Sequence, residues 1–397
     1  MPEPGRPATE YVRALTGLRG VAALAVFLFH YGFFNPQIRL DLTVPVIGPA
    51  LQFPLGVGFA GVDLFFVLSG FLLTLPFAWN MLTGQPHPAL GRYALRRLLR
   101  VFPAYYAQLA IMLLVGAWFV AWHPLGGRAL LAHALMFFNL GPHPVRPMVG
   151  IWWTLPVELS FYLVLPLLAL WMRPASWRVV LGLGILISLV YRLFVLYHFG
   201  GRGEQAVVMA ASQLPGTLPE FLFGASAAIW TCHRQLAGRP ALSPLTLNLM
   251  LIGGGAVAAA WLQWVVLPNG YIYWQGHWSM LVGPLVLGLA LALIVVSLHG
   301  GSPIGQWLLA NRPVYALGLI SYSFYLWHFV VLQQLEAGSA GWYAGMAEWP
   351  RFLLSLGAVT AVAALSYALF ERPFQVWSAR QKKRRAQTVR GGNQDSS

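Results

Sequence analysis

An arginine and a histidine lie inside the first apolar segment of the chain, where ionisable side chains are costly. Arg19 and His30 are eleven residues apart within residues 14–34. On a helix this spacing is about 16 Å along the axis and about 20° away from one shared face. An ionisable group inside an apolar span marks a candidate functional site. An imidazole can accept a proton from a hydroxyl, so His30 is a candidate general base. The alternative is that Arg19 only extends its charged end to the membrane surface and that His30 only packs against its neighbours.

Two other ionisable residues are expected at a similar depth. Glu158 lies about 10 Å into its apolar segment, and His328 lies about 22 Å along another segment that runs the opposite way. With His30 they fall in one layer, roughly 6–10 Å below the same membrane surface. A carboxylate that pairs with an imidazole orients the ring and stabilises its protonated form. We therefore predict His30 and Glu158 as catalytic residues, although depth alone does not establish lateral contact.

A third group of candidates has less specific signals. Asp63 stands at the start of the second apolar segment, where it either contributes to the site or lies at the membrane interface. Ser69 and Gly70, further along that segment, would allow close helix packing. The candidates for binding an acceptor or supporting the catalytic groups are His328, Tyr325, Trp153 and Asp63.

A basic cluster marks the start of the third apolar segment. Arg97 and Arg100 are three residues apart, so they share one face of a helix and could hold a phosphate between them. Basic residues also gather at the cytoplasmic ends of membrane spans simply as anchors. The spacing alone leaves both interpretations open.

These residues must be positioned by helices within a membrane. Of the 397 residues, 58% are hydrophobic and 9% are charged, against about 25% charged in soluble domains. The mean hydropathy is +0.65, and apolar stretches of roughly 20 residues recur, as transmembrane helices require. We predict an all-α, polytopic transmembrane protein of about ten spans. The predicted spans are 14–34, 58–80, 101–122, 151–172, 179–198, 214–232, 244–267, 278–298, 313–335 and 351–371.

The apolar segment 130–140 is too short to span the membrane and is predicted to be a half-helix. Without it, both termini are cytoplasmic and 19 of the 25 Lys and Arg residues lie inside. If it spans, only 11 lie inside and 14 lie outside. The preference for basic residues on the cytoplasmic side therefore favours ten spans. Residues 1–13 are then a cytoplasmic N-terminus, 14–374 the membrane domain, and 375–397 a basic disordered cytoplasmic tail.

The net charge of +14 does not indicate nucleic-acid binding, because the basic residues lie at segment ends and in the tail. The tail carries five charges within residues 380–385 and is expected to touch anionic lipid. The single cysteine, Cys232, excludes an intramolecular disulfide and a cysteine-rich metal site. We predict no metal and no bound cofactor.

An ordered set of motifs resembles the membrane acyltransferases known as acyltransferase family 3, which include bacterial O-acetylases of surface polysaccharides. The resemblance covers about Leu15 to Phe374. Each motif alone is weak, and the ordered set is specific. The motifs are Leu18-Arg19-Gly20 with His30, Asp63 to Phe71, Arg96 to Arg100, Trp153-Thr154-Leu155 with Glu158, Ser321-Tyr322-Ser323 leading to Trp327-His328, and Phe370-Glu371-Arg372-Pro373.

The resemblance implies a ten-helix protein of the bacterial inner membrane. It implies an acyl-CoA donor, usually acetyl-CoA, taken from the cytoplasm and an acceptor hydroxyl often reached from the other face. His30 matches the catalytic histidine of the family and Arg19 the arginine of the same motif. Arg97 and Arg100 match an Arg-x-x-Arg pair associated with donor binding. We therefore expect Arg19, Arg97 and Arg100 to bind the donor.

The predicted function is transfer of an acyl group, most simply acetyl, to a hydroxyl of a cell-envelope carbohydrate or related acceptor. A lipid or saccharide transporter without chemistry would use the same buried charges, but the chain has no visible internal repeat of the kind many transporters carry. A structural scaffold would not need His30, His328 and Glu158 within hydrocarbon. The sequence does not distinguish polysaccharide, lipid-linked sugar, glucan and macrolide acceptors. It also does not distinguish direct transfer to the acceptor from transfer through an acyl-enzyme intermediate.

Overall fold

The computed structural model describes most of the membrane domain. The described residues are 12–36, 43–44, 48–49, 52–116, 125–138, 145–171, 176–200, 202, 204–269, 276–338, 341–378 and 380–381. The predicted tail beyond residue 381 and the N-terminus before residue 12 lie outside them.

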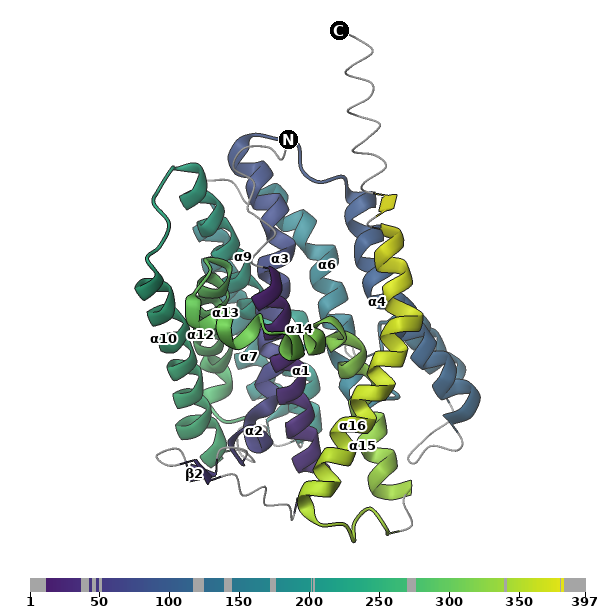
Figure 1. Ribbon diagram of the computed structural model, residues 1–397. Coiled ribbons are helices and arrows are strands. Elements are labelled where there is room, and N and C mark those ends of the chain that lie inside the picture. Colours follow the sequence, from purple (N-terminus) through teal and green to yellow (C-terminus); the bar gives the residue numbers. More distant parts are fainter. Residues whose placement is uncertain are drawn as a thin grey trace.

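Within the described residues, ten long helices form the bundle in Figure 1. Their apolar sequences favour helices because, within a bilayer, every backbone polar group must be satisfied inside its own segment. The long helices are α1 (Val12–Phe34), α3 (Gly61–Thr83), α4 (Leu90–Val115), α6 (Thr154–Trp171), α7 (Trp177–Phe199), α9 (Leu214–Leu236), α10 (Pro244–Trp261), α12 (Ser279–His299), α15 (Ser321–Gly338) and α16 (Glu348–Ser366).

Short elements connect these helices. Two strands of two residues each, paired antiparallel, are the only β-structure among the described residues, so the predicted all-α class is confirmed. The short helices are α2 (Gln52–Val57), α5 (Gly127–Ala134), α8 (Glu204–Ala211), α13 (Pro303–Leu309) and α14 (Arg312–Leu319). Single turns of 3₁₀- or π-helix cover Gly58–Ala60, Gly150–Trp153, Leu262–Val266, Leu267–Asn269 and Tyr367–Glu371, and the strands are β1 (Thr43–Val44) and β2 (Gly48–Pro49).

The described helices can be compared with the prediction of about ten spans. Eight of the described helices are long and apolar enough to cross a membrane, and nine if α14 and α15 count as one broken span. The prediction of one continuous span over 313–335 is wrong, because α14 and α15 meet at an angle of 75°. The remaining predicted span corresponds to α9, whose 23 residues include the buried acid Glu220.

The segment around 130–140 forms only the eight-residue helix α5, as its length predicted, and residues 139–140 lie outside the described residues. His133 anchors α5: its Nδ1 lies 2.8 Å from the Ala129 carbonyl oxygen, and its Nε2 accepts from the Met148 backbone N–H at 2.9 Å. Burial lowers the pKa of His133. The ring is therefore neutral, as an accepting Nε2 requires.

Close helix contacts through glycine fix the frame around α3. A Cβ on Gly70 would lie 2.1 Å from the Phe221 backbone oxygen, and one on Gly224 would lie 2.1 Å from the Val67 oxygen. Only glycine permits α3 and α9 to approach so closely. The close approach predicted from Ser69 and Gly70 is thus present.

The first helix is clamped by α13 and α14, which run across α1 in the front of Figure 1. A Cβ on Gly318 would lie 1.9 Å from the Thr16 oxygen, and one on Gly17 would lie 1.9 Å from the Leu309 oxygen. The side chain of Asn311 accepts from the backbone N–H of Val314 and so caps the start of α14. The contacts of α13 and α14 with α1 therefore hold the helix that carries Arg19 and His30 in place.

Candidate active site

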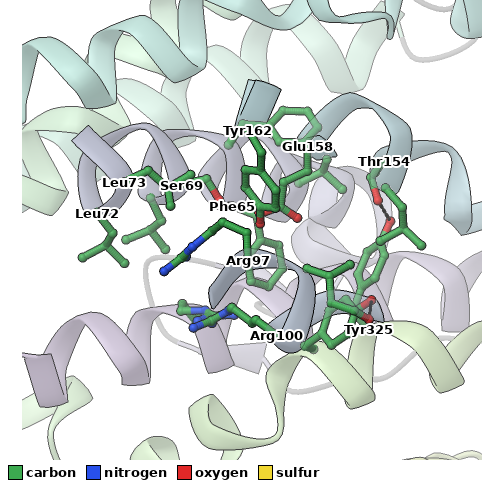
Figure 2. A pocket seen from close by; sticks show the side chains of 17 residues that line it. Phe65, Ser69, Leu72, Leu73, Arg97, Arg100, Thr154, Glu158, Tyr162 and Tyr325 are labelled. Carbon is green, nitrogen blue, oxygen red and sulfur yellow. Dashed lines mark hydrogen bonds between the residues drawn. The ribbon is translucent and has the colours of Figure 1, made fainter. Parts of the chain in front are cut away.

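Three arginines predicted to bind a donor lie around one cavity, here called the arginine cavity. Arg19 comes from α1, and Arg97 and Arg100 come from α4. The cavity volume is about 80 Å³, and Figure 2 shows Arg97 and Arg100 extending to the same side of it. The helix α4 begins at Leu90, before the start predicted at residue 101, so both arginines project from a formed helix.

The arginines lack a matching set of carboxylates within the described part of the chain. Glu158 is the only acidic residue that lines the arginine cavity. The Nε atom of Arg97 is buried without a hydrogen-bond partner. Because a buried donor without a partner is costly, an anion in this cavity would be stabilised both by charge and by hydrogen bonding.

Glu158 itself is held by two hydroxyl groups. Its Oε1 accepts from Ser69 Oγ at 2.8 Å and from the Tyr162 hydroxyl at 2.5 Å. Figure 2 shows Glu158 and Tyr162 together at the edge of the cavity. The carboxylate is thus fixed in the wall of the arginine cavity and not beside an imidazole.

His30 lines a second and larger cavity, here called the histidine cavity, with a volume of about 320 Å³. Asp63 and Trp153, both candidates from the sequence, also line it. Aromatic rings from several helices form much of the wall. They are Phe29, Phe33, Phe59, Phe66, Trp153, Tyr325 and Phe329.

His30 is paired with His328. Nε2 of the fully buried His328 lies 3.2 Å from Nδ1 of His30. Nδ1 of His328 lies 2.6 Å from the Tyr325 carbonyl oxygen, and Nδ1 of His30 lies 2.9 Å from the Val26 carbonyl oxygen.

These contacts determine the tautomers. A carbonyl oxygen only accepts, so His328 carries its proton on Nδ1, and its Nε2 is an acceptor. Nδ1 of His30 then carries a proton that faces two acceptors, the Val26 oxygen and Nε2 of His328. The unprotonated atom of His30 is Nε2, for which the described residues offer no hydrogen-bond partner. An imidazole in this form can accept a proton.

The two cavities share part of their walls. Val62 and Phe66 of α3 and Tyr325 of α15 line both. The Tyr325 hydroxyl donates to the Ile151 oxygen at 2.8 Å and lies 3.0 Å from Thr154 Oγ1. The arginine cavity and the histidine cavity are therefore neighbours that share these three side chains.

The predicted pairing of Glu158 with an imidazole is wrong, because Glu158 lines the arginine cavity and His328 occupies the position beside His30. A similar depth did not bring the three groups together, since α6 and α1 carry Glu158 and His30 on opposite sides of the shared wall. A catalytic role for Glu158 stays a prediction.

Two functional candidates were missed by the sequence analysis. Arg192 of α7 and Glu220 of α9 are buried and line the histidine cavity. Both lie inside segments predicted as spans. The rule that an ionisable residue within a span marks a candidate site would have found them.

Comparison with known proteins identifies a family and several relatives of the chain. A family model described as an acyltransferase domain matches residues 12–370. Peptidoglycan O-acetyltransferase OatA of Listeria monocytogenes is 25% identical over 93% of the chain and 57% of its own length. The putative peptidoglycan O-acetyltransferase YrhL of Bacillus subtilis is 26% identical over 94% of the chain and 56% of its own length. O-acetyltransferase OatA of Staphylococcus aureus is 24% identical over 92% of the chain and 57% of its own length.

The chain thus spans somewhat more than half the length of these relatives. No solved structure matches it. The resemblance seen in the sequence is confirmed by a family match over nearly the whole chain. The chain belongs to the family of the acyltransferase domain.

Proposed function

We propose that this protein is an integral membrane O-acyltransferase that moves an acetyl group from acetyl-CoA to a hydroxyl of a cell-envelope carbohydrate. The relatives named as peptidoglycan O-acetyltransferases support a carbohydrate acceptor. The observation that carries the proposal is the placement of three arginines and a base-competent histidine in two cavities with a common wall.

The arginine cavity binds the donor. Its three guanidinium groups outnumber its single carboxyl group, and CoA carries several phosphate charges. The excess of basic residues on one side of the predicted topology supports a cytoplasmic position for this cavity and for both termini. The extended arm of CoA then carries the thioester toward the shared wall.

His30 acts as the general base. Its Nε2 takes the proton of the acceptor hydroxyl while the hydroxyl oxygen attacks the thioester carbonyl carbon. A C–O bond forms, and the C–S bond of the thioester breaks. The CoA thiolate leaves and takes the proton back from the imidazolium, so the enzyme returns to its starting state.

His328 positions His30 for this step. By accepting from Nδ1–H, it holds the tautomer in which Nε2 is free, which is the role that a carboxylate has in a Ser-His-Asp triad. The step therefore needs no carboxylate beside His30.

The direct test uses purified protein with acetyl-CoA and chitotetraose, an oligomer of β-linked N-acetylglucosamine. We expect release of free CoA thiol together with an acetylated oligosaccharide detected by mass spectrometry. Absence of thioester cleavage with chitotetraose, with a glucan oligomer and with peptidoglycan fragments would reject the proposed function. Movement of the sugar across vesicles without acetylation would instead identify a transporter.

A further inference from the structure

Three ionisable residues of the histidine cavity have no part in the chemistry described above. Asp63 comes from α3, Glu220 from α9 and Arg192 from α7. They line the same cavity as His30 although they are far apart in the sequence. Placing three such groups among apolar helices is costly, which indicates a function beyond packing.

The two acids form a pair. Asp63 and Glu220 are joined by a hydrogen bond between their side chains. Two carboxyl groups can make such a bond only if one of them holds a proton. The pair therefore carries one proton and one negative charge.

The two acids of the pair differ in burial. Glu220 is 1% exposed, and apart from Asp63 no described residue pairs with its buried Oε2. Asp63 is only half-buried and lines the cavity. The acid pair therefore meets the cavity of about 320 Å³ through Asp63, and its negative charge favours a ligand with hydroxyl or amide donors.

Arg192 supplies hydrogen-bond donors, whereas the acid pair supplies acceptors. Its Nε donates to the Gly216 oxygen at 2.7 Å, and its Nη1 donates to the Met280 oxygen at 2.6 Å. These bonds fix the guanidinium between α9 and α12, while Nη2 has no described acceptor. The N–H groups of Nη2 are thus left for a ligand oxygen, and the positive charge of Arg192 balances the negative charge of the acid pair.

The rest of the wall suits a sugar ring. Aromatic side chains such as Trp153 and Phe329 provide flat apolar faces, and His30 lies among them. Such a cavity combines apolar surfaces with a few fixed polar groups, as small-molecule sites do. Because its described charges balance, an uncharged polyhydroxyl ligand fits better than an anion.

We propose that Asp63, Glu220 and Arg192 bind the acceptor in the histidine cavity, with the acid pair accepting from hydroxyls of an uncharged sugar and Arg192 donating to one of its oxygens. This inference rests on the proposed function, because it places the acceptor hydroxyl next to His30. It assigns acceptor recognition to three residues that lie outside the arginine cavity.

The first test measures acceptor binding without turnover. In a His30→Ala background, chitotetraose binding is measured by calorimetry, and Glu220→Leu is then added. We expect the affinity to fall on the order of 10–100-fold, since hydrogen bonds to charged groups are strong. Glu220→Gln should recover most of this loss, because an amide can still donate to Asp63 and accept from the sugar.

The matched control is Glu371→Gln, which also changes a buried carboxyl but lines neither cavity. It should leave chitotetraose affinity unchanged. Equal affinity in the parent and Glu220→Leu would overturn the inference, and so would absence of chitotetraose binding to the parent.

The second test separates this inference from the proposed function. Acetyl transfer is measured with active protein that carries Glu220→Leu or Arg192→Leu, and the KM values for acetyl-CoA and for chitotetraose are compared. We expect only the chitotetraose KM to rise. Transfer by the parent with unchanged chitotetraose KM in both variants would overturn this inference alone, whereas absence of transfer by the parent would overturn the proposed function.

Discussion

The arginine cavity and the histidine cavity share Val62, Phe66 and Tyr325 but differ in charge and in size. The arginine cavity has about 80 Å³ and three cationic side chains against one carboxyl group. The histidine cavity has about 320 Å³, aromatic walls, and an acid pair opposite a single arginine. In our proposal the first binds an anion and the second binds a larger uncharged molecule. A transfer reaction needs both kinds of site within reach of one reacting group.

This comparison predicts that the largest effect comes from the base. His30→Ala should lower kcat by about 10²–10⁴-fold, as loss of a general base typically does, while the KM for acetyl-CoA stays nearly unchanged. His198→Ala, an exposed histidine on α7, is the matched control and should keep full activity. Turnover near the parent level in folded His30→Ala protein would remove His30 from the mechanism.

The positioning role of His328 predicts the next effect. His328→Leu cannot accept from Nδ1–H of His30, so we expect kcat to fall by about 10–100-fold, which is less than the 10²–10⁴-fold expected for complete loss of the base. His328→Asn keeps one acceptor and one donor and should restore much of the lost kcat. Both variants should show the same KM for acetyl-CoA. Equal kcat for the two variants would show that His328 only packs.

Substitution of an arginine in the arginine cavity is expected to change only the KM for the donor, acetyl-CoA. Arg100→Ala should raise the KM for acetyl-CoA by roughly tenfold, the value of one charge-assisted hydrogen bond. Arg100→Lys should restore binding only in part, because a point charge cannot reproduce the guanidinium geometry. If Arg100 serves only as a membrane anchor, lysine will substitute fully and activity will follow the amount of inserted protein.

Substitution of Tyr325, which lines both cavities, is expected to have the smallest effect on kcat. Tyr325→Phe removes the hydroxyl that bonds to the Ile151 oxygen and to Thr154, so the ring should become less firmly held. We expect kcat to fall about threefold to tenfold, consistent with one lost neutral hydrogen bond. Steady-state kinetics with both substrates varied will check this. A change confined to one KM would show that Tyr325 belongs to one cavity only.

Much of the fold could be predicted because hydropathy reports directly on membrane helices. The all-α class and the short α5 follow from the length of apolar segments. The break between α14 and α15 could not be predicted this way. The sequence stays apolar through Leu319 and Ile320, so the 75° bend has no hydropathy signal and depends on the packing of α14 against α1.

The depth of the site residues could be predicted from the sequence, whereas their lateral neighbours could not. Arg19, Arg97 and Arg100 line one cavity, as their predicted common role requires. Glu158 and His328 were both placed near His30 by depth, and only His328 contacts it. Which helices are adjacent depends on glycine contacts such as those of Gly70, and a single sequence does not reveal the partner helix of a glycine.

Bisubstrate kinetics on Arg100→Ala and Glu220→Leu test the division of work between the two cavities most directly. The KM values for acetyl-CoA and chitotetraose are measured for each variant and for the parent at equal amounts of folded protein. Two separate sites predict that only the acetyl-CoA KM rises in Arg100→Ala and only the chitotetraose KM rises in Glu220→Leu. A rise of both KM values in both variants would contradict the assignment of donor and acceptor to different cavities.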